Sequence, residues 1–165
     1  MAVWLQARFS WSEGAWFILG EAAHRGAPHL QKFGIQMFDW MWERGWDKDF
    51  GGLCYFRDVR NLPTHEYYQD MKFCWPHNET ILASLLAWKL TGDANYSDRH
   101  ALVHEWTYAR FSDSEFGEQF GYLHRDGTPS IDLKGNWWKG GGGHVGRMQL
   151  LASNWLADLT VRGTL

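Results

Sequence analysis

The chain has 165 residues, with 16 lysines and arginines and 19 aspartates and glutamates, giving a formal net charge of −3. This length predicts one domain spanning residues 1–165, and the mixed charges exclude the basic patch that nucleic acid or an anionic membrane requires. The two cysteines, Cys54 and Cys74, fit neither a disulfide framework nor a paired zinc motif, as expected of a cytoplasmic protein. Neither a signal peptide nor a membrane span is predicted.

Apolar residues recur at helical spacing in five segments, at residues 3–23, 29–42, 77–90, 96–111 and 145–159. The third segment has the clearest pattern, because its leucines and isoleucine form one stripe. Pro76 suits the first turn of that helix, and Gly92 suits its end. The sequence therefore predicts an all-α protein with five helices.

Two segments between these helices resemble each other. Residues 46–58 read WDKDFGGLCYFRD, residues 111–126 read FSDSEFGEQFGYLHRD, and an offset of 66 superimposes DFGG on EFGE. Each copy continues through a short hairpin to a loop rich in tryptophan and histidine, and then to a helix. Stacked helical hairpins of this kind predict an α/α solenoid or toroid, in which equivalent loops meet at one end. His77, Glu79 and His144 are expected to share a cavity there.

Two patterns resemble ligand sites but lack the necessary surroundings. The segment GGGHVGRM at 141–148 is close to a phosphate-binding loop, but no buried strand precedes it, and Met148 replaces the hydroxyl residue that would hold magnesium. His100 and His104 lie four residues apart without an evident third metal ligand. We interpret the two histidines as polar positions on an exposed helix face, and we predict no metal.

His144 and Glu79 are the candidates for chemistry, each with a simpler alternative. Four glycines and Gly146 flank His144, so the backbone can approach a ligand closely, although the same glycines also suit a floppy segment. Glu79, in WPHNET, lies near the start of a predicted helix, where an acidic residue complements the helix dipole. It follows an aromatic run in a loop equivalent to that of His144, which favours a role in a site.

Three stretches, YYQDMKFCWPHNETILASLLAWKLTGDANY, DSEFGEQFGYLHRDGTPSIDLKGNWWKG and HVGRMQLL, together resemble the N-acylglucosamine 2-epimerase family, whose relatives include cellobiose 2-epimerases and aldose–ketose isomerases. The resemblance covers about residues 10–155. It implies an (α/α)6-like toroid, of which this chain is about half, the C-terminal half, with short β-hairpins in its loops. It also implies proton transfer at C2 of an open-chain sugar by histidines, without a cofactor.

Position by position, the resemblance implies His144 and Glu79 as catalytic residues and Arg147 as a ligand of substrate oxygen or the developing enolate. The further substrate-binding residues that we predict are His77, Trp75, Trp138, Asp70, Lys72 and Glu13. Ser10 stands where the family has its second histidine, and a serine cannot replace imidazole as a base near neutral pH.

The predicted function is interconversion of N-acylglucosamine and N-acylmannosamine by proton transfer at C2, in an incomplete or weakly active form. One alternative is a non-catalytic sugar-binding or assembly half that acts with another chain. Another is glycoside hydrolysis by Glu79 paired with Asp70 or Glu118. The expected partners are a small sugar substrate and, for assembly, a second copy in a homodimer or a complementary N-terminal half.

Overall fold

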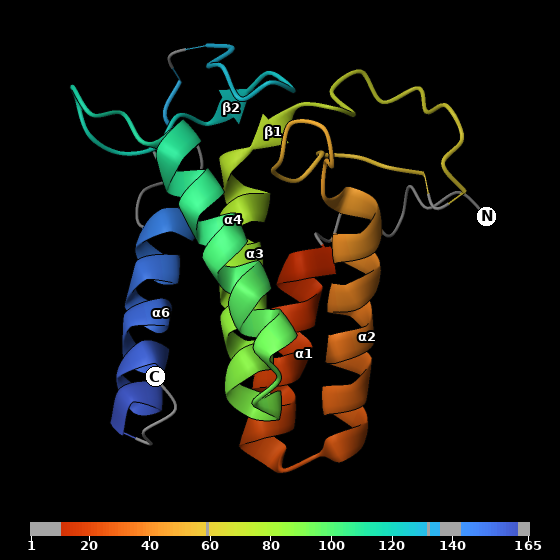
Figure 1. The fold of residues 1–165 in the computed structure, drawn as a ribbon, viewed down its shortest axis with the longest axis vertical. Coiled ribbons are helices and arrows are strands. Elements are labelled where there is room, and N and C mark those ends of the chain that lie inside the picture. The colour runs from red at the N-terminus through yellow and green to blue at the C-terminus, as the bar shows by residue number, and fades with distance from the viewer. Residues whose placement is uncertain (1–10, 59, 132, 136–142, 162–165) are drawn as a thin grey trace.

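The computed structural model describes residues 11–58, 60–131, 133–135 and 143–161 (Figure 1). Within these residues the helices are α1 (Trp11–Arg25), α2 (Pro28–Gly45), α3 (Cys74–Thr91), α4 (Ala94–Phe111) and α6 (His144–Val161). A small antiparallel sheet pairs β1 (Lys72–Phe73) with β2 (Tyr122–Leu123). The five predicted helical segments are confirmed, except that residues 3–10 lie outside the described part.

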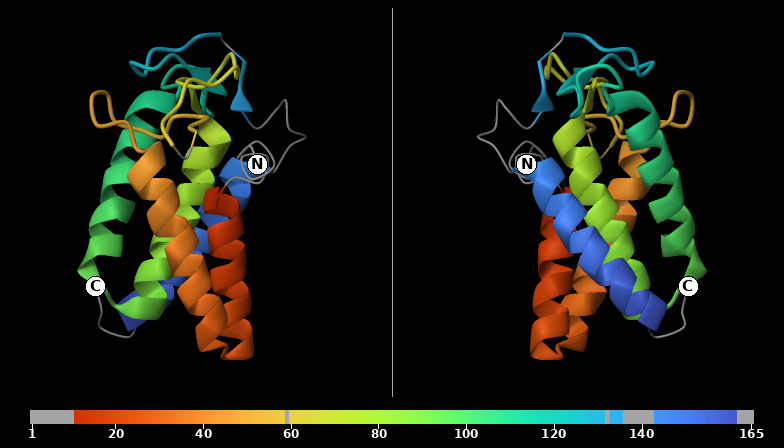
Figure 2. Two further views of the ribbon diagram at one scale, coloured as in Figure 1. Left: turned by 90° about the vertical axis from the view of Figure 1, so that its right-hand side faces the viewer. Right: turned by 90° about the vertical axis from the view of Figure 1, so that its left-hand side faces the viewer.

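The helices form two antiparallel hairpins followed by a further helix. α2 packs on α1, α4 packs on α3, and α3 lies between α1 and α6. α1, α3 and α6 run parallel, and their N-termini lie at the end of the molecule where the long loops gather (Figures 1 and 2). Three helix starts from distant parts of the sequence therefore come close together.

Short turns join the helices of each hairpin at the opposite end. Pro28 is the first residue of α2, where the missing N–H of proline leaves no intrahelical bond unmade. Gly92 ends α3 in the left-handed conformation, with φ of 70°, which glycine adopts without steric cost. The Asp93 side chain then accepts a hydrogen bond from the backbone N–H of Asn95 at 2.9 Å and starts α4.

α3 forms the centre of the core. Every residue from Pro76 to Ala87 is buried, so the helix is covered on all faces rather than along one stripe. One core cluster joins it to α1 and α2 through Leu19 and Phe38, and another joins it to α4 and α6 through Val103 and Met148. Burial on both sides fixes the position of α3 relative to α1 and α6.

The sequence repeat is also a structural repeat. Asp47 Oδ1 accepts hydrogen bonds from the backbone N–H groups of residues 49 and 50, at 3.1 and 3.3 Å. Asp113 Oδ1 makes the equivalent pair of bonds 66 residues later, at 2.9 and 3.1 Å. Residues 51–52 have φ of 72° and 70°, and residues 117–118 have φ of 75° and 67°. The two turns thus share one backbone geometry.

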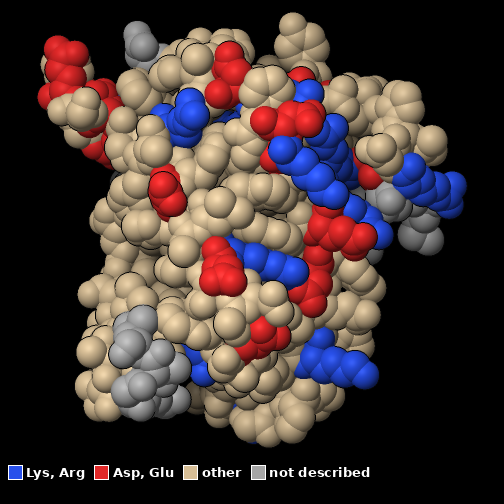
Figure 3. All heavy atoms as spheres, viewed as in Figure 1, with Lys and Arg blue, Asp and Glu red and all other residues tan. Residues whose placement is uncertain are grey.

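Basic and acidic side chains are interspersed on the face drawn in Figure 3, without an extended patch of one sign. Among the described helices, none is both long and apolar enough to cross a membrane. Within the same residues, His, Cys, Asp and Glu side chains form no group of three or more that is placed to hold a metal ion.

Candidate functional site

The starts of α1, α3 and α6 bring three side chains together around one carboxylate, and these four residues, Trp16, Glu79, His144 and Arg147, are called the Glu79 group. Glu79 of α3 is fully buried. Trp16 of α1 contacts its Oε2 atom, and His144 and Arg147 of α6 both contact its Oε1 atom. His144 is 65 residues from Glu79 in the sequence, and the two side chains meet as the repeat predicts.

The contacts determine which nitrogen of His144 is free. Three donors surround Glu79, and its carboxylate accepts from the indole N–H of Trp16, from Arg147 Nη2 and from His144 Nδ1. His144 Nδ1 therefore carries a hydrogen. In a neutral imidazole this leaves the free lone pair on Nε2. Arg147 Nη2 is also 3.3 Å from Nδ1, but both atoms are donors in this arrangement, so the contact is not a hydrogen bond.

The exposed fraction of the side chains in this group increases from Glu79 to His144 and to Arg147. The Glu79 side chain is 0% exposed, that of His144 is 22% exposed and that of Arg147 is 38% exposed. The charge of Glu79 is thus compensated by a guanidinium and by hydrogen bonds, while His144 keeps access to solvent. The Trp75 ring lies 5.6 Å from the His144 ring and provides an aromatic surface beside it.

His77 is not part of this group. It is fully buried, its Nδ1 donates to the Phe73 carbonyl oxygen at 2.7 Å, and its Nε2 accepts from the backbone N–H of Leu53 at 2.8 Å. The ring also stacks on Trp106, with centroids 5.0 Å apart. Burial lowers the pKa of His77 to about 3. The expected substrate-binding role is therefore not supported, and His77 instead joins the first repeated turn to α3.

The buried histidines predict an acid-labile fold. Burial also lowers the pKa of His100 to about 4, because this ring packs partly under the surface against Ser84 and the Ile81 carbonyl instead of lying on an exposed face. An unfolded histidine binds a proton below about pH 6.5, whereas the folded protein does not. Each histidine then removes about 1.4 kcal/mol of stability per pH unit on acidification.

Urea unfolding at several pH values between 6.5 and 5 measures this loss. The free energy of unfolding is expected to fall with pH, and His77→Gln is expected to reduce the slope by about half, because one of the two buried imidazoles is gone. A free energy of unfolding that stays constant over this range would contradict the prediction.

Lys72 is paired with another carboxylate, and Asp70 is exposed. The side chain of Lys72 is 0% exposed, and its Nζ is 2.9 Å from Asp47 Oδ2, to which Arg125 Nε also donates at 2.7 Å. Burial alone would raise the pKa of Asp47, but the hydrogen bonds from Arg125 and Lys72 outweigh it and hold that pKa well below its usual range. Lys72 thus belongs to a buried ion cluster, and Asp70 is exposed in the preceding turn.

Two further predicted residues fall outside what the structure describes. Trp138 lies in the segment 136–142, and of Glu13 only the backbone, within α1, is described. Trp16 was not predicted from the sequence. Its place in an apolar helix gives only a core signal, and its function as a donor depends on the approach of α3.

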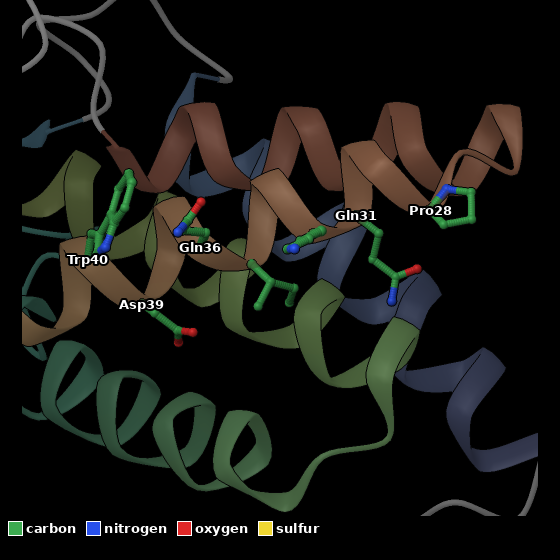
Figure 4. A pocket seen from close by; sticks show the side chains of 7 residues that line it. Pro28, Gln31, Gln36, Asp39 and Trp40 are labelled. Atoms are coloured by element: carbon green, nitrogen blue, oxygen red, sulfur yellow. The ribbon is translucent and has the colours of Figure 1, made fainter.

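Two grooves lie on the outer helices, away from Glu79. One, of about 500 Å³, runs along α2 and is lined by residues that include Gln31, Asp39 and Trp40 (Figure 4). The other, of about 430 Å³, lies between α4 and α6, where His104 and Leu156 are among its lining residues. Neither groove is lined by Glu79, His144 or Arg147.

Comparisons with known proteins identify the family of the chain. The family model described as N-acylglucosamine 2-epimerase matches residues 10–139. The chain belongs to this family. It is 38% identical over 151 residues to N-acylglucosamine 2-epimerase of Bos taurus, which is 91% of this chain and 36% of the relative. It is 37% identical over 129 residues to the Rattus norvegicus protein of the same name, covering 78% of this chain and 31% of the relative.

Two solved structures share the fold of this N-acylglucosamine 2-epimerase family member. D-mannose isomerase matches with a TM-score of 0.76 and 19% identity over 90% of this chain and 37% of that chain. Cellobiose 2-epimerase from Spirochaeta thermophila matches with a TM-score of 0.64 and 13% identity over 74% of this chain and 29% of that chain. The α/α toroid fold is therefore confirmed, and the chain spans about a third of the length of the curated relatives it matches.

Proposed function

We propose that this chain carries a proton-transfer site of a sugar 2-epimerase, with His144 moving the proton at C2 of an N-acylated hexosamine. The contact between His144 Nδ1 and the buried Glu79 carboxylate is the observation that carries the proposal. This contact fixes the ring and leaves Nε2 as the free acceptor. Family membership supports the reaction class, and the curated relatives are named for this substrate.

In the proposed step, His144 Nε2 takes the C2 hydrogen of the open-chain sugar, whose acidity comes from the adjacent carbonyl. Negative charge then develops on the carbonyl oxygen. Arg147 lies beside His144, and its side chain is 38% exposed, so its guanidinium can donate to that oxygen. Glu79 stabilises the imidazolium that forms, in the way that carboxylates support catalytic histidines.

Inversion at C2 requires return of a proton to the opposite face, and thus a second donor. We assign this donor to a group beyond the described residues, either elsewhere in this chain or in a complementary chain. In the second case the proposal includes assembly with a further part, either a second copy or an N-terminal half, that faces the Glu79 group.

Deuterium exchange tests the proposal. The purified chain is incubated with N-acetylmannosamine in heavy water, and ¹H NMR follows the C2 signal. Deuterium at C2 is the expected result, because even half of the reaction exchanges that hydrogen with solvent. A sugar that binds without exchanging would favour the non-catalytic sugar-binding alternative, which the partial coverage of the relatives also makes reasonable.

Hydrolysis by paired carboxylates has no support in the geometry. Glu79 faces His144 and Arg147, while Asp70 and Glu118 are both exposed in turns of the loop end. A glycosidase requires two carboxylates flanking one bond.

A further inference from the structure

Trp16 of α1 contacts both charged partners of the proposed proton-transfer group. Its Nε1 atom donates to Glu79 Oε2 at 2.5 Å. Its ring also lies under the guanidinium of Arg147, with Arg147 Cζ 5.4 Å from the ring centroid. The contacts from α6 go to the other carboxylate oxygen, Oε1. One indole thus reaches the carboxylate from the side opposite to His144 and also supports Arg147.

We propose that Trp16 is a positioning residue, which holds Glu79 Oε2 so that Oε1 faces His144 and which supports the plane of the Arg147 guanidinium. The proposal rests on the proposed function of the site. The last torsion of a glutamate side chain is broad and roughly two-fold, so packing alone does not set the direction of its oxygens. A charge-assisted hydrogen bond to one oxygen sets it.

The surroundings of Trp16 make it a rigid donor. The ring packs against both core clusters, the one that contains Leu19 and Phe38 and the one that contains Leu82 and Met148. An indole held in this way has one polar edge, and that edge needs a partner when it is removed from water. The face of the same ring attracts a guanidinium. Trp16 uses both its N–H, which binds Glu79, and its ring face, which contacts Arg147. A residue that only fills the apolar core would need neither contact.

Trp16→Phe separates positioning from packing, because phenylalanine keeps an aromatic face and removes the N–H. We expect kcat for C2 deuterium exchange to fall roughly 10-fold while KM changes little, since a hydrogen bond to a charged group is lost and the sugar contacts remain. Trp155→Phe is the matched control, because Trp155 packs against the same two core clusters. That variant is expected to keep the kcat of the unmodified chain. An equal fall in kcat in the two variants would overturn the proposal.

An NMR measurement tests the hydrogen bond from Trp16 to Glu79 independently of activity. In a chain labelled with ¹⁵N at tryptophan, the indole signal that Trp16→Phe removes is the Trp16 signal. We expect Glu79→Gln to move this signal upfield and to leave the Trp155 signal in place, because the Trp16 indole N–H donates to that carboxylate. A Trp16 signal that does not respond would overturn the proposal even if exchange occurs. If the unmodified chain shows no exchange, the proposed function fails, and the NMR result alone decides whether Trp16 holds Glu79.

Discussion

Substitution of His144 by glutamine is expected to slow deuterium exchange at C2 by a factor of about 10² to 10⁴, the range that a general acid or base contributes. Glutamine retains a donor for Glu79 Oε1 but has no group that takes up a proton near neutral pH. KM for N-acetylmannosamine should change far less than kcat, because the ring acts on the reacting hydrogen. Initial rates of exchange by ¹H NMR at several sugar concentrations measure both quantities.

His104→Gln is the control for this substitution. His104 is an exposed histidine on α4, in contact with Tyr108 and away from Glu79, and its loss should leave the exchange rate unchanged. Circular dichroism confirms that both variants keep their helices. A His144→Gln chain that retains more than about a tenth of the original rate would remove His144 from the proposed role, because that loss is below the range for acid–base catalysis.

Substitution of Asp47 by alanine is expected to cost about 3–5 kcal/mol of unfolding free energy, the usual effect of breaking a buried ion pair from one side. Lys72 would remain fully buried without the carboxylate that now lies 2.9 Å from its Nζ. The variant would also lose the two hydrogen bonds that Asp47 accepts in the first repeated turn. Urea denaturation followed by circular dichroism measures the change in the free energy of unfolding.

The repeat supplies a matched comparison for this prediction. Asp113 accepts the same two backbone hydrogen bonds in the second turn, but its lysine partner, Lys134, is 22% exposed. Asp113→Ala therefore removes the equivalent hydrogen bonds without leaving a fully buried cation unpaired. Its loss of unfolding free energy should be distinctly smaller than that of Asp47→Ala. Equal losses at the two positions would mean that the turns, and not the buried cation, account for the effect.

Much of the fold could be predicted from the sequence because local signals and the tertiary structure agree. Pro76 and Gly92 bound a helix in the sequence, and α3 runs from Cys74 to Thr91. The 66-residue repeat also predicted the convergence of Glu79 with His144, since equivalent loops of stacked hairpins meet at one end. The complete burial of α3 could not be predicted from the sequence. A leucine stripe predicts that one face of the helix is covered, but it does not show how many other helices pack against it.

The roles of individual polar residues were harder to predict because they depend on distant partners. His77 and Lys72 lie in an aromatic loop that favours a site, but Leu53 and Asp47, 24 and 25 residues earlier, bind them inside the protein. No local pattern shows whether a histidine accepts from a backbone N–H or faces a substrate. Trp16 was missed for the converse reason, because its apolar surroundings hide the one donor edge of its ring.

The residues of the Glu79 group lie in helices, while the long loops at the same end of the molecule are connecting segments. Trp16, Glu79 and Arg147 lie within α1, α3 and α6, whose spacing is set by the core. The connecting segments that follow α2 and α4 lie at the same end of the molecule (Figure 1). Such connections tolerate changes in length and sequence better than packed helices. In the proposed function, sugar contacts can therefore change in the loops without moving Glu79 or Arg147.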